Sequence, residues 1–153
     1  PEYVHTVVSC YKEAIASVLD GTFTEEKKDA WDERLATVFN RGFWDGYYQG
    51  QTIGEWNKNY GSCATEKKVL VGKVVKYFSK LGVAEVAVEA SEFGVGDKLL
   101  VTGNATGALW LTADEIRYDL KPVERALQRQ RVSIPVPEKV RPNDKLYRID
   151  IQK

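Results

Sequence analysis

Histidine, cysteine and methionine are scarce in this 153-residue chain, and their scarcity limits the chemistry that it can carry. It has one histidine, His5, and two cysteines, Cys10 and Cys63, which lie far apart in the sequence. These three side chains are too few for a four-ligand zinc or iron–sulfur site. A Ser/His/Asp or Cys/His catalytic arrangement would have to use His5, and no Gly-x-Ser-x-Gly motif accompanies it. The sequence therefore predicts no catalytic residue, no metal ligand and no cofactor within this chain.

Long apolar runs are also missing. No run approaches the ~18–20 apolar residues that span a bilayer, and no signal-peptide pattern is present. We therefore expect no membrane partner and a reducing, cytoplasmic compartment in which both thiols stay free of disulfides. Because the sequence contains no methionine, not even an initiator, we expect it to be part of a longer protein.

The chain has no net charge, but its two parts differ. Residues 1–66 carry 6 Lys and Arg against 11 Asp and Glu, whereas residues 67–153 carry 16 against 11. One interpretation is that the acidic part docks on the basic part, or that neither docks at all. The other is a basic face for nucleic acid, which the asymmetry permits without establishing it.

The first 40 residues have the period of helices. Apolar residues recur three and four apart from Val4 to Leu19, and Asp20-Gly21 ends this first helix with a glycine suited to a left-handed C-cap. Thr24 is a predicted N-cap, followed by a second helix. Its predicted buried residues are Trp31, Leu35, Val38 and Phe39. The result is a helical hairpin over about residues 3–40, which needs a partner surface to bury both apolar stripes.

The period changes from 3.6 to 2 at Lys68. We predict strands at 69–78, 83–89, 97–102, 107–111, 113–118, 132–136 and 145–151, separated by Gly, Asn and Pro turns. Several short strands of this kind are typical of a small closed barrel. The predicted fold class is thus α+β: residues 1–67 form a helical hairpin with a connecting segment, and residues 68–153 form an all-β barrel.

An Asp-Lys-Leu step occurs twice in the predicted barrel, at Asp97–Leu99 and Asp144–Leu146. Each follows a turn residue and leads into a predicted strand. In this the segment resembles the second domain of translation elongation factors, a six-stranded Greek-key barrel. The resemblance concerns the fold only.

Residues 40–50 are the most informative stretch, because three glycines punctuate four aromatic side chains and one arginine. In one interpretation the aromatics fill the junction between hairpin and barrel. In the other, Arg41 and the aromatics line a binding surface for a missing domain or for RNA, because arginine and aromatic rings suit stacking on bases. The candidate binding residues are Arg41, Phe43, Trp44, Tyr47 and Tyr48, with Arg129 and Arg131 of the barrel, which share one face if that segment is extended.

The run Asn40-Arg41-Gly42-Phe43-x2-Gly46-Tyr47-x2-Gly50 resembles a signature of the collagenase-like peptidases of family U32. The opening Tyr3-Val4-x3-Val7-Val8-x2-Tyr11 is similar to the helix that follows the main domain of that family. The resemblance implies the region after a TIM-like domain whose four cysteines bind an iron–sulfur cluster, and those cysteines have no counterpart here. Some members are classed as peptidases or collagenases, and others act in hydroxylation of tRNA or ribosomal RNA or in ubiquinone synthesis.

The resemblance implies two functions for this chain. The first is a non-catalytic accessory region, a scaffold or substrate-binding part that serves the upstream TIM-like domain and holds protein substrate. The second is an RNA-binding appendage of a tRNA- or rRNA-hydroxylating enzyme. The RNA function requires a contiguous basic face near the Arg41 aromatics, and the protease function does not.

Overall fold

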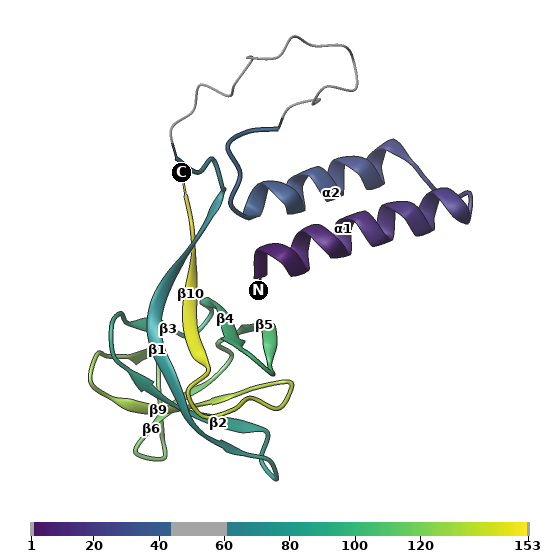
Figure 1. Cartoon of the computed structure of the whole chain (residues 1–153). Coiled ribbons are helices and arrows are strands. Elements are labelled where there is room, and N and C mark those ends of the chain that lie inside the picture. The colour runs from purple at the N-terminus through teal and green to yellow at the C-terminus, as the bar shows by residue number, and fades with distance from the viewer. Residues whose placement is uncertain (1, 44–60, 153) are drawn as a thin grey trace. The chain divides into compact units, whose positions relative to one another are not determined.

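The computed structural model describes residues 2–43 and 61–152 (Figure 1). The chain separates into two compact units. We call Tyr3–Glu66 with Ile151–Lys153 the helical unit, and Lys67–Asp150 with Pro1–Glu2 the β unit. The division into two domains, 1–67 and 68–153, stays a prediction.

Two helices form the hairpin that the sequence predicts: α1, Glu2–Leu19, and α2, Glu25–Thr37. Gly21 has a φ of 68°, and the Thr22 N–H donates to the Ser17 carbonyl at 2.8 Å. These contacts form a Schellman motif, which satisfies carbonyls that the end of α1 leaves open. Thr24 is the N-cap of α2 and its hydroxyl accepts from the Lys27 N–H at 3.3 Å. Both predicted helix boundaries in this loop are therefore confirmed.

The faces that the helices bury differ from the prediction. The buried residues of α1 are Thr6, Cys10 and Ser17, and α2 has none. Glu13 continues the same four-and-three spacing as these residues, and its carboxylate accepts from Trp31 and Arg34 of α2. The small side chains of this face, and not the apolar stripe, thus lie on the side of α1 that meets α2. The predicted burial of Phe39 is also wrong, because α2 ends at Thr37 and Phe39 is exposed, whereas Trp31, Leu35 and Val38 are partly buried.

The β unit is built from ten strands (Figure 1). Seven of them correspond to predicted strands: β1 (Glu66–Phe78), β2 (Val83–Val88), β4 (Lys98–Gly103), β5 (Gly107–Thr112), β6 (Ile116–Tyr118), β9 (Arg131–Pro135) and β10 (Lys145–Ile151). Three short strands were not predicted: β3 (Phe93–Gly94), β7 (Lys121–Val123) and β8 (Arg125–Ala126). Each has two or three residues, which is too short for a visible alternation of apolar and polar side chains.

The strand pairings correct the predicted closed barrel. Eight strands form one sheet in the order β5-β4-β10-β1-β2-β9-β6-β7, and β3 pairs with β8 separately. Within the described residues this order has two ends, β5 and β7, so hydrogen bonds do not close it. β7 contains Pro122, which has no N–H to donate, and proline is typical of edge strands.

A glycine permits a close approach between two strands of this sheet. A Cβ at Gly72 of β1 would lie 1.8 Å from the backbone oxygen of Ala87 in β2. The register of the β1–β2 pair shifts between Val74 and Lys76, a bulge that bends the long strand.

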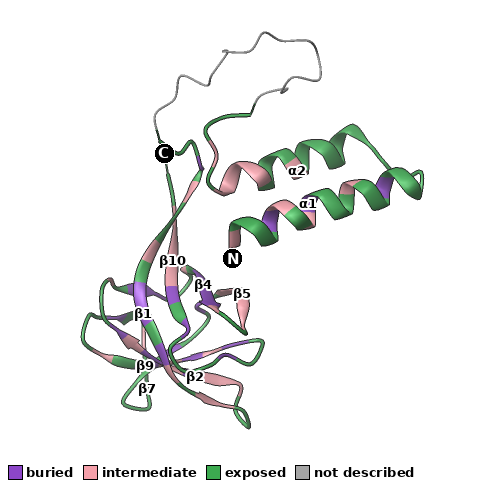
Figure 2. Ribbon diagram, viewed as in Figure 1, coloured by how far each residue is buried: buried purple, intermediate pink, exposed green. Residues whose placement is uncertain are grey.

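The core of the β unit comes from alternating side chains. In β2 the residues Ala84, Val86 and Val88 are buried, while their neighbours are partly exposed. Buried segments lie mainly in the strands, and α2 shows none (Figure 2). Phe93, Leu99, Ile116, Ile134 and Leu146 complete the same apolar cluster and are inaccessible to solvent. The alternation places the apolar side chains on one face of the sheet, and that face forms the core.

The Asp-Lys-Leu repeat of the sequence is a structural repeat as well. The Asp97 carboxylate accepts from the Gly94 N–H at 2.7 Å, and the Asp144 carboxylate accepts from the Arg141 N–H at 2.8 Å. The residues before them, Gly96 and Asn143, have φ values of 90° and 71°. The strands that follow, β4 and β10, pair antiparallel with each other. Each aspartate thus closes an identical turn at the entry to one of two neighbouring strands.

Candidate interaction surfaces

Seven large apolar side chains of α1 are exposed, and we call them the α1 stripe: Tyr3, Val4, Val8, Tyr11, Ile15, Val18 and Leu19. Exposure of their side chains ranges from 47% for Tyr3 to 80% for Leu19. Five of them, from Val4 to Val18, follow the spacing four, three, four, three, which places them on one face of the helix. Monomeric proteins seldom leave a continuous apolar surface of this kind in water. The α1 stripe is therefore a candidate contact surface.

The candidate residues of the aromatic–glycine segment divide between described and undescribed parts. Arg41 and Phe43 are exposed, the latter at 61%. Trp44, Tyr47 and Tyr48 lie outside the described residues. The predicted plug of aromatic side chains at the junction is therefore untested, and Phe43 presents its ring to solvent.

Asn40, which is not among the predicted site residues, fixes the start of that segment. Its side-chain amide donates to the Ala36 and Val38 carbonyls, at 3.3 and 2.9 Å, and its side-chain oxygen accepts from the Gly42 N–H at 3.0 Å. Its backbone carbonyl accepts from the Cys63 N–H at 2.7 Å. Because the Asn-x-Gly spacing allows such a turn, the asparagine could have been recognised as a cap from the sequence.

Arg129 and Arg131 do not share one extended strand. Arg129 lies in a turn with a φ of 71°, and its N–H donates to the Val88 carbonyl at 2.7 Å. Arg131 begins β9, and its guanidinium lies 3.9 Å from the Glu85 carboxylate of β2. Both are exposed, but the left-handed conformation of Arg129 shows that the segment is not extended, which was the condition for a common face.

Other basic side chains of the β unit lie beside carboxylates. Ion pairs join Lys73 to Glu89 at 2.9 Å and Arg117 to Glu115 at 2.7 Å. Further pairs join Arg125 to Glu92 at 3.8 Å and Arg148 to Asp150 at 2.7 Å. Acidic and basic groups are thus interspersed over these strands rather than segregated into faces of one sign.

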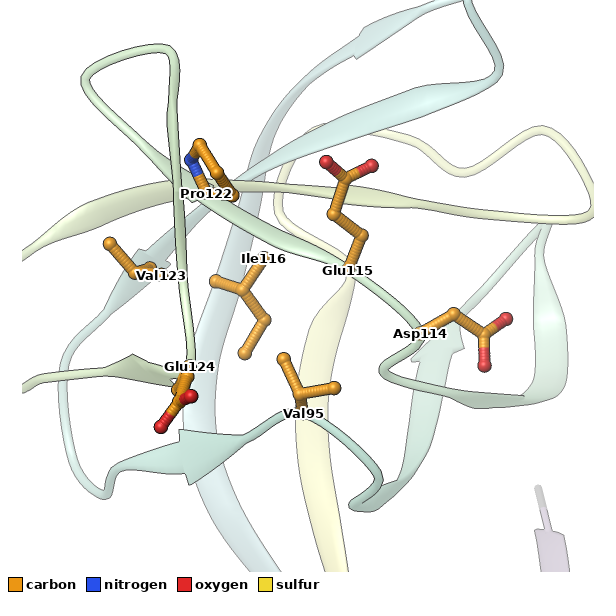
Figure 3. Close-up of a pocket in the computed structure, with 7 residues that line it drawn as sticks. All are labelled: Val95, Asp114, Glu115, Ile116, Pro122, Val123 and Glu124. Carbon is orange, nitrogen blue, oxygen red and sulfur yellow. The ribbon is translucent and has the colours of Figure 1, made fainter.

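A shallow hollow of about 260 Å³ lies beside β6 and β7 (Figure 3). Its apolar lining is Val95, Ile116, Pro122 and Val123, with the acidic residues Asp114, Glu115 and Glu124 around it. The three carboxylates point in different directions in Figure 3, and Glu115 is held by Arg117. They do not converge as a pair of catalytic acids would, so the hollow suits contact with a side chain rather than acid–base chemistry.

The potential nucleophile Cys10 is built into the packing of the helical unit. Its side chain is only 2% exposed, and burial raises the pKa of its thiol, which disfavours the reactive thiolate. Among residues 2–43 and 61–152, no group of three or more His, Cys, Asp and Glu is placed to hold a metal ion. The four-cysteine iron–sulfur site implied by the family resemblance does not fit this chain, which has two cysteines.

None of the helices in the described ranges is long and apolar enough to cross a membrane.

Comparison with known proteins identifies relatives of the whole chain. The model of peptidase family U32 matches residues 1–58. The collagenase of Porphyromonas gingivalis is 59% identical over 150 residues, which cover 98% of this chain and 36% of that protein, or 42% of a second sequence of the enzyme. An uncharacterized protease of Methanocaldococcus jannaschii is 30% identical over 153 residues, 36% of its length.

Among solved structures, the C-terminal domain of a Geobacillus thermoleovorans protein assigned to the U32 peptidases is similar to part of the chain. The similarity covers 52% of this chain and 90% of that domain, with 20% identity and a TM-score of 0.49. The chain spans less than half the length of the curated relatives that it matches. Residues 1–58 thus carry the match to peptidase family U32, and nearly the whole chain is homologous to a portion of Porphyromonas gingivalis collagenase.

Proposed function

We propose that this chain is a non-catalytic accessory region of a collagenase-like U32 protease, which supports the rest of the protease and contacts its protein substrate. The observation that carries the proposal is the 59% identity with a collagenase, extending over 98% of the chain but only 36% of that enzyme. The chain thus corresponds to only part of that enzyme.

The surfaces of the chain support contact rather than chemistry. The α1 stripe presents large apolar side chains, and the hollow beside β6 and β7 combines an apolar lining with nearby carboxylates. An apolar surface with acidic groups at its margin favours the aliphatic stems and charged ends of lysine and arginine side chains. Extended protein substrates rich in lysine and arginine would therefore suit the hollow.

The alternative, an RNA-binding appendage, has less support from the described surface. It requires a contiguous basic face near Arg41, whereas five basic residues of the β unit lie beside carboxylates. Phosphate contacts by lysine and arginine supply most of the affinity of proteins for nucleic acid, so this interspersion disfavours the RNA function.

Exchange of the homologous portion of Porphyromonas gingivalis collagenase tests the proposal. Four proteins are compared for gelatin cleavage: the intact enzyme, the enzyme without that portion, a chimera carrying this chain in its place, and this chain alone. We expect cleavage by the intact enzyme and the chimera, a large loss in the deletion, and none by the isolated chain. Cleavage by the isolated chain would show that it is catalytic, and full activity of the deletion would show that it is no accessory.

A further inference from the structure

The helical unit has almost no core of its own. Among its described residues, the buried apolar side chains are Cys10 and Ala64, and α2 buries none. The continuous core cluster consists entirely of residues from Val71 to Leu146, all in the β unit. Two helices that bury so little cannot be stabilised by their mutual contact alone.

The α1 stripe lies on a different face from the contact with α2. Thr6, Cys10 and Ser17 occupy the buried side, together with Glu13, which binds α2. From Val4 to Val18 the α1 stripe extends over about 21 Å along the helix axis. Its four-three repeat is the pattern that inserts into a groove on a neighbouring apolar surface. α1 thus presents a second apolar face that α2 does not cover and that a further partner can bind.

The extent of the family match indicates which partner this is. The U32 family model covers residues 1–58, which include α1 and α2 but none of the strands found in the described ranges. The helical unit therefore belongs to the family domain itself. The relatives contain more than half of their length outside the region that this chain spans.

We propose that the α1 stripe docks against an apolar groove on the part of the U32 protease that lies outside these 153 residues, and so joins the accessory region to the rest of the enzyme. This inference rests on the proposed function, because it assigns the surface through which the accessory region is attached. The partner surface is apolar and about four turns of helix long, and it belongs to the same polypeptide.

Thiol labelling of two neighbouring positions tests this docking. Ile15 belongs to the α1 stripe, and Ala16 is an exposed residue beside it that does not. Ile15→Cys and Ala16→Cys are made both in the isolated chain and in the chimera with Porphyromonas gingivalis collagenase, and maleimide labelling is quantified by peptide mass spectrometry. The tryptic peptide of residues 13–27 contains neither Cys10 nor Cys63.

We expect both positions to react at similar rates in the isolated chain, and position 15 to react at least about tenfold more slowly than position 16 in the chimera, as burial of a site in a cooperative unit predicts. Equal rates in the chimera would overturn the docking. Protection of position 15 already in the isolated chain would also overturn it, in favour of the β unit or a second copy as the partner.

A second pair of variants extends the test to stability. Ile15→Lys should lower the melting temperature of the chimera by several degrees, whereas Ala16→Lys should leave it unchanged. Equal shifts would contradict the docking. Gelatin cleavage separates the two proposals: an active chimera with an unprotected position 15 refutes the docking alone, and an inactive chimera with a protected position 15 refutes the accessory function alone.

Discussion

The β unit and the helical unit use apolar side chains in opposite ways. In β2, alternate residues point inward and are completely buried by the other strands. In α1, apolar residues are spaced just as regularly, yet Tyr11, Ile15 and Val18 are each about 60% exposed. Hydrophobic periodicity therefore reveals which side chains share a face, but not whether the chain itself covers that face. The difference predicts that the β unit is stable by itself and that the helical unit depends on a partner.

The two units should differ most in how much stability they lose when an apolar side chain is removed. Phe93 is inaccessible to solvent, so Phe93→Ala should lower the free energy of unfolding of the β unit by about 3–5 kcal/mol. Ile15→Ala in the isolated chain should change stability by no more than about 0.5 kcal/mol, because an exposed side chain loses few contacts. Urea unfolding followed by circular dichroism measures both. Comparable losses of stability in the two variants would contradict the proposed difference between the units.

The two aspartate turns of the β unit offer a finer comparison. Asp144 is 5% exposed and accepts from the Arg141 N–H and the Thr106 hydroxyl, whereas Asp97 is partly exposed. Asp144→Ala should cost about 1–3 kcal/mol, because it removes a buried acceptor and leaves two partly buried hydrogen bonds unmade. Asp97→Ala should cost less, since water can replace part of its role. Thermal unfolding of the two variants ranks them, and an equal or reversed order would refute the argument from burial.

The stability of the contact between the two helices at Glu13 should depend on pH. Hydrogen bonds from Arg34 and then Trp31 hold the pKa of Glu13 below its ordinary value. A lowered pKa gives stability that is present above the unfolded value, about 4.3, and is lost as the pH falls through the lower folded value. We therefore expect the helical signal in circular dichroism to melt earlier at strongly acidic than at neutral pH.

Glu13→Gln is the control, because it keeps an acceptor but cannot be ionised. It should melt early at neutral pH and lose much of its additional dependence on acid. The effect should be small, since the pair is half exposed and screened by solvent. An unchanged acid dependence in this variant would exclude Glu13 as its origin.

The smallest effect should come from Arg41. Its side chain is exposed, so Arg41→Ala in the isolated chain should alter the free energy of unfolding by less than about 0.5 kcal/mol. A loss of 1 kcal/mol or more, as expected for a buried partner left unpaired, would show that Arg41 anchors the segment instead of facing solvent.

Much of the fold could be predicted because its signals are local. The Thr24 cap, the Gly21 turn and the change of period near Lys68 depend on residues close in sequence, and the structure places them as expected. Barrel closure could not be predicted in this way. It depends on hydrogen bonds between strands distant in sequence, and β7, which carries the proline at an end of the sheet, is too short to show in the pattern.

The candidate surfaces were harder to predict than the fold. The sequence correctly identified apolar residues on one face of α1, but their exposure depends on which face α2 occupies, and this is set by Glu13, Trp31 and Arg34. Arg129 and Arg131 would share a face only in an extended segment, and Arg129 has a positive φ instead. Only glycine and a few polar residues adopt that conformation readily, so an arginine gives no warning of it.

Native-state hydrogen exchange of the isolated 153-residue chain tests the central claim most directly. If the β unit carries its own core and the helical unit requires a partner, amides of β1, β2 and β9 should exchange only through global unfolding of the sheet. Amides of α1 and α2 should exchange far faster, through local opening. Protection of both helices to the same free energy as the sheet would contradict the account.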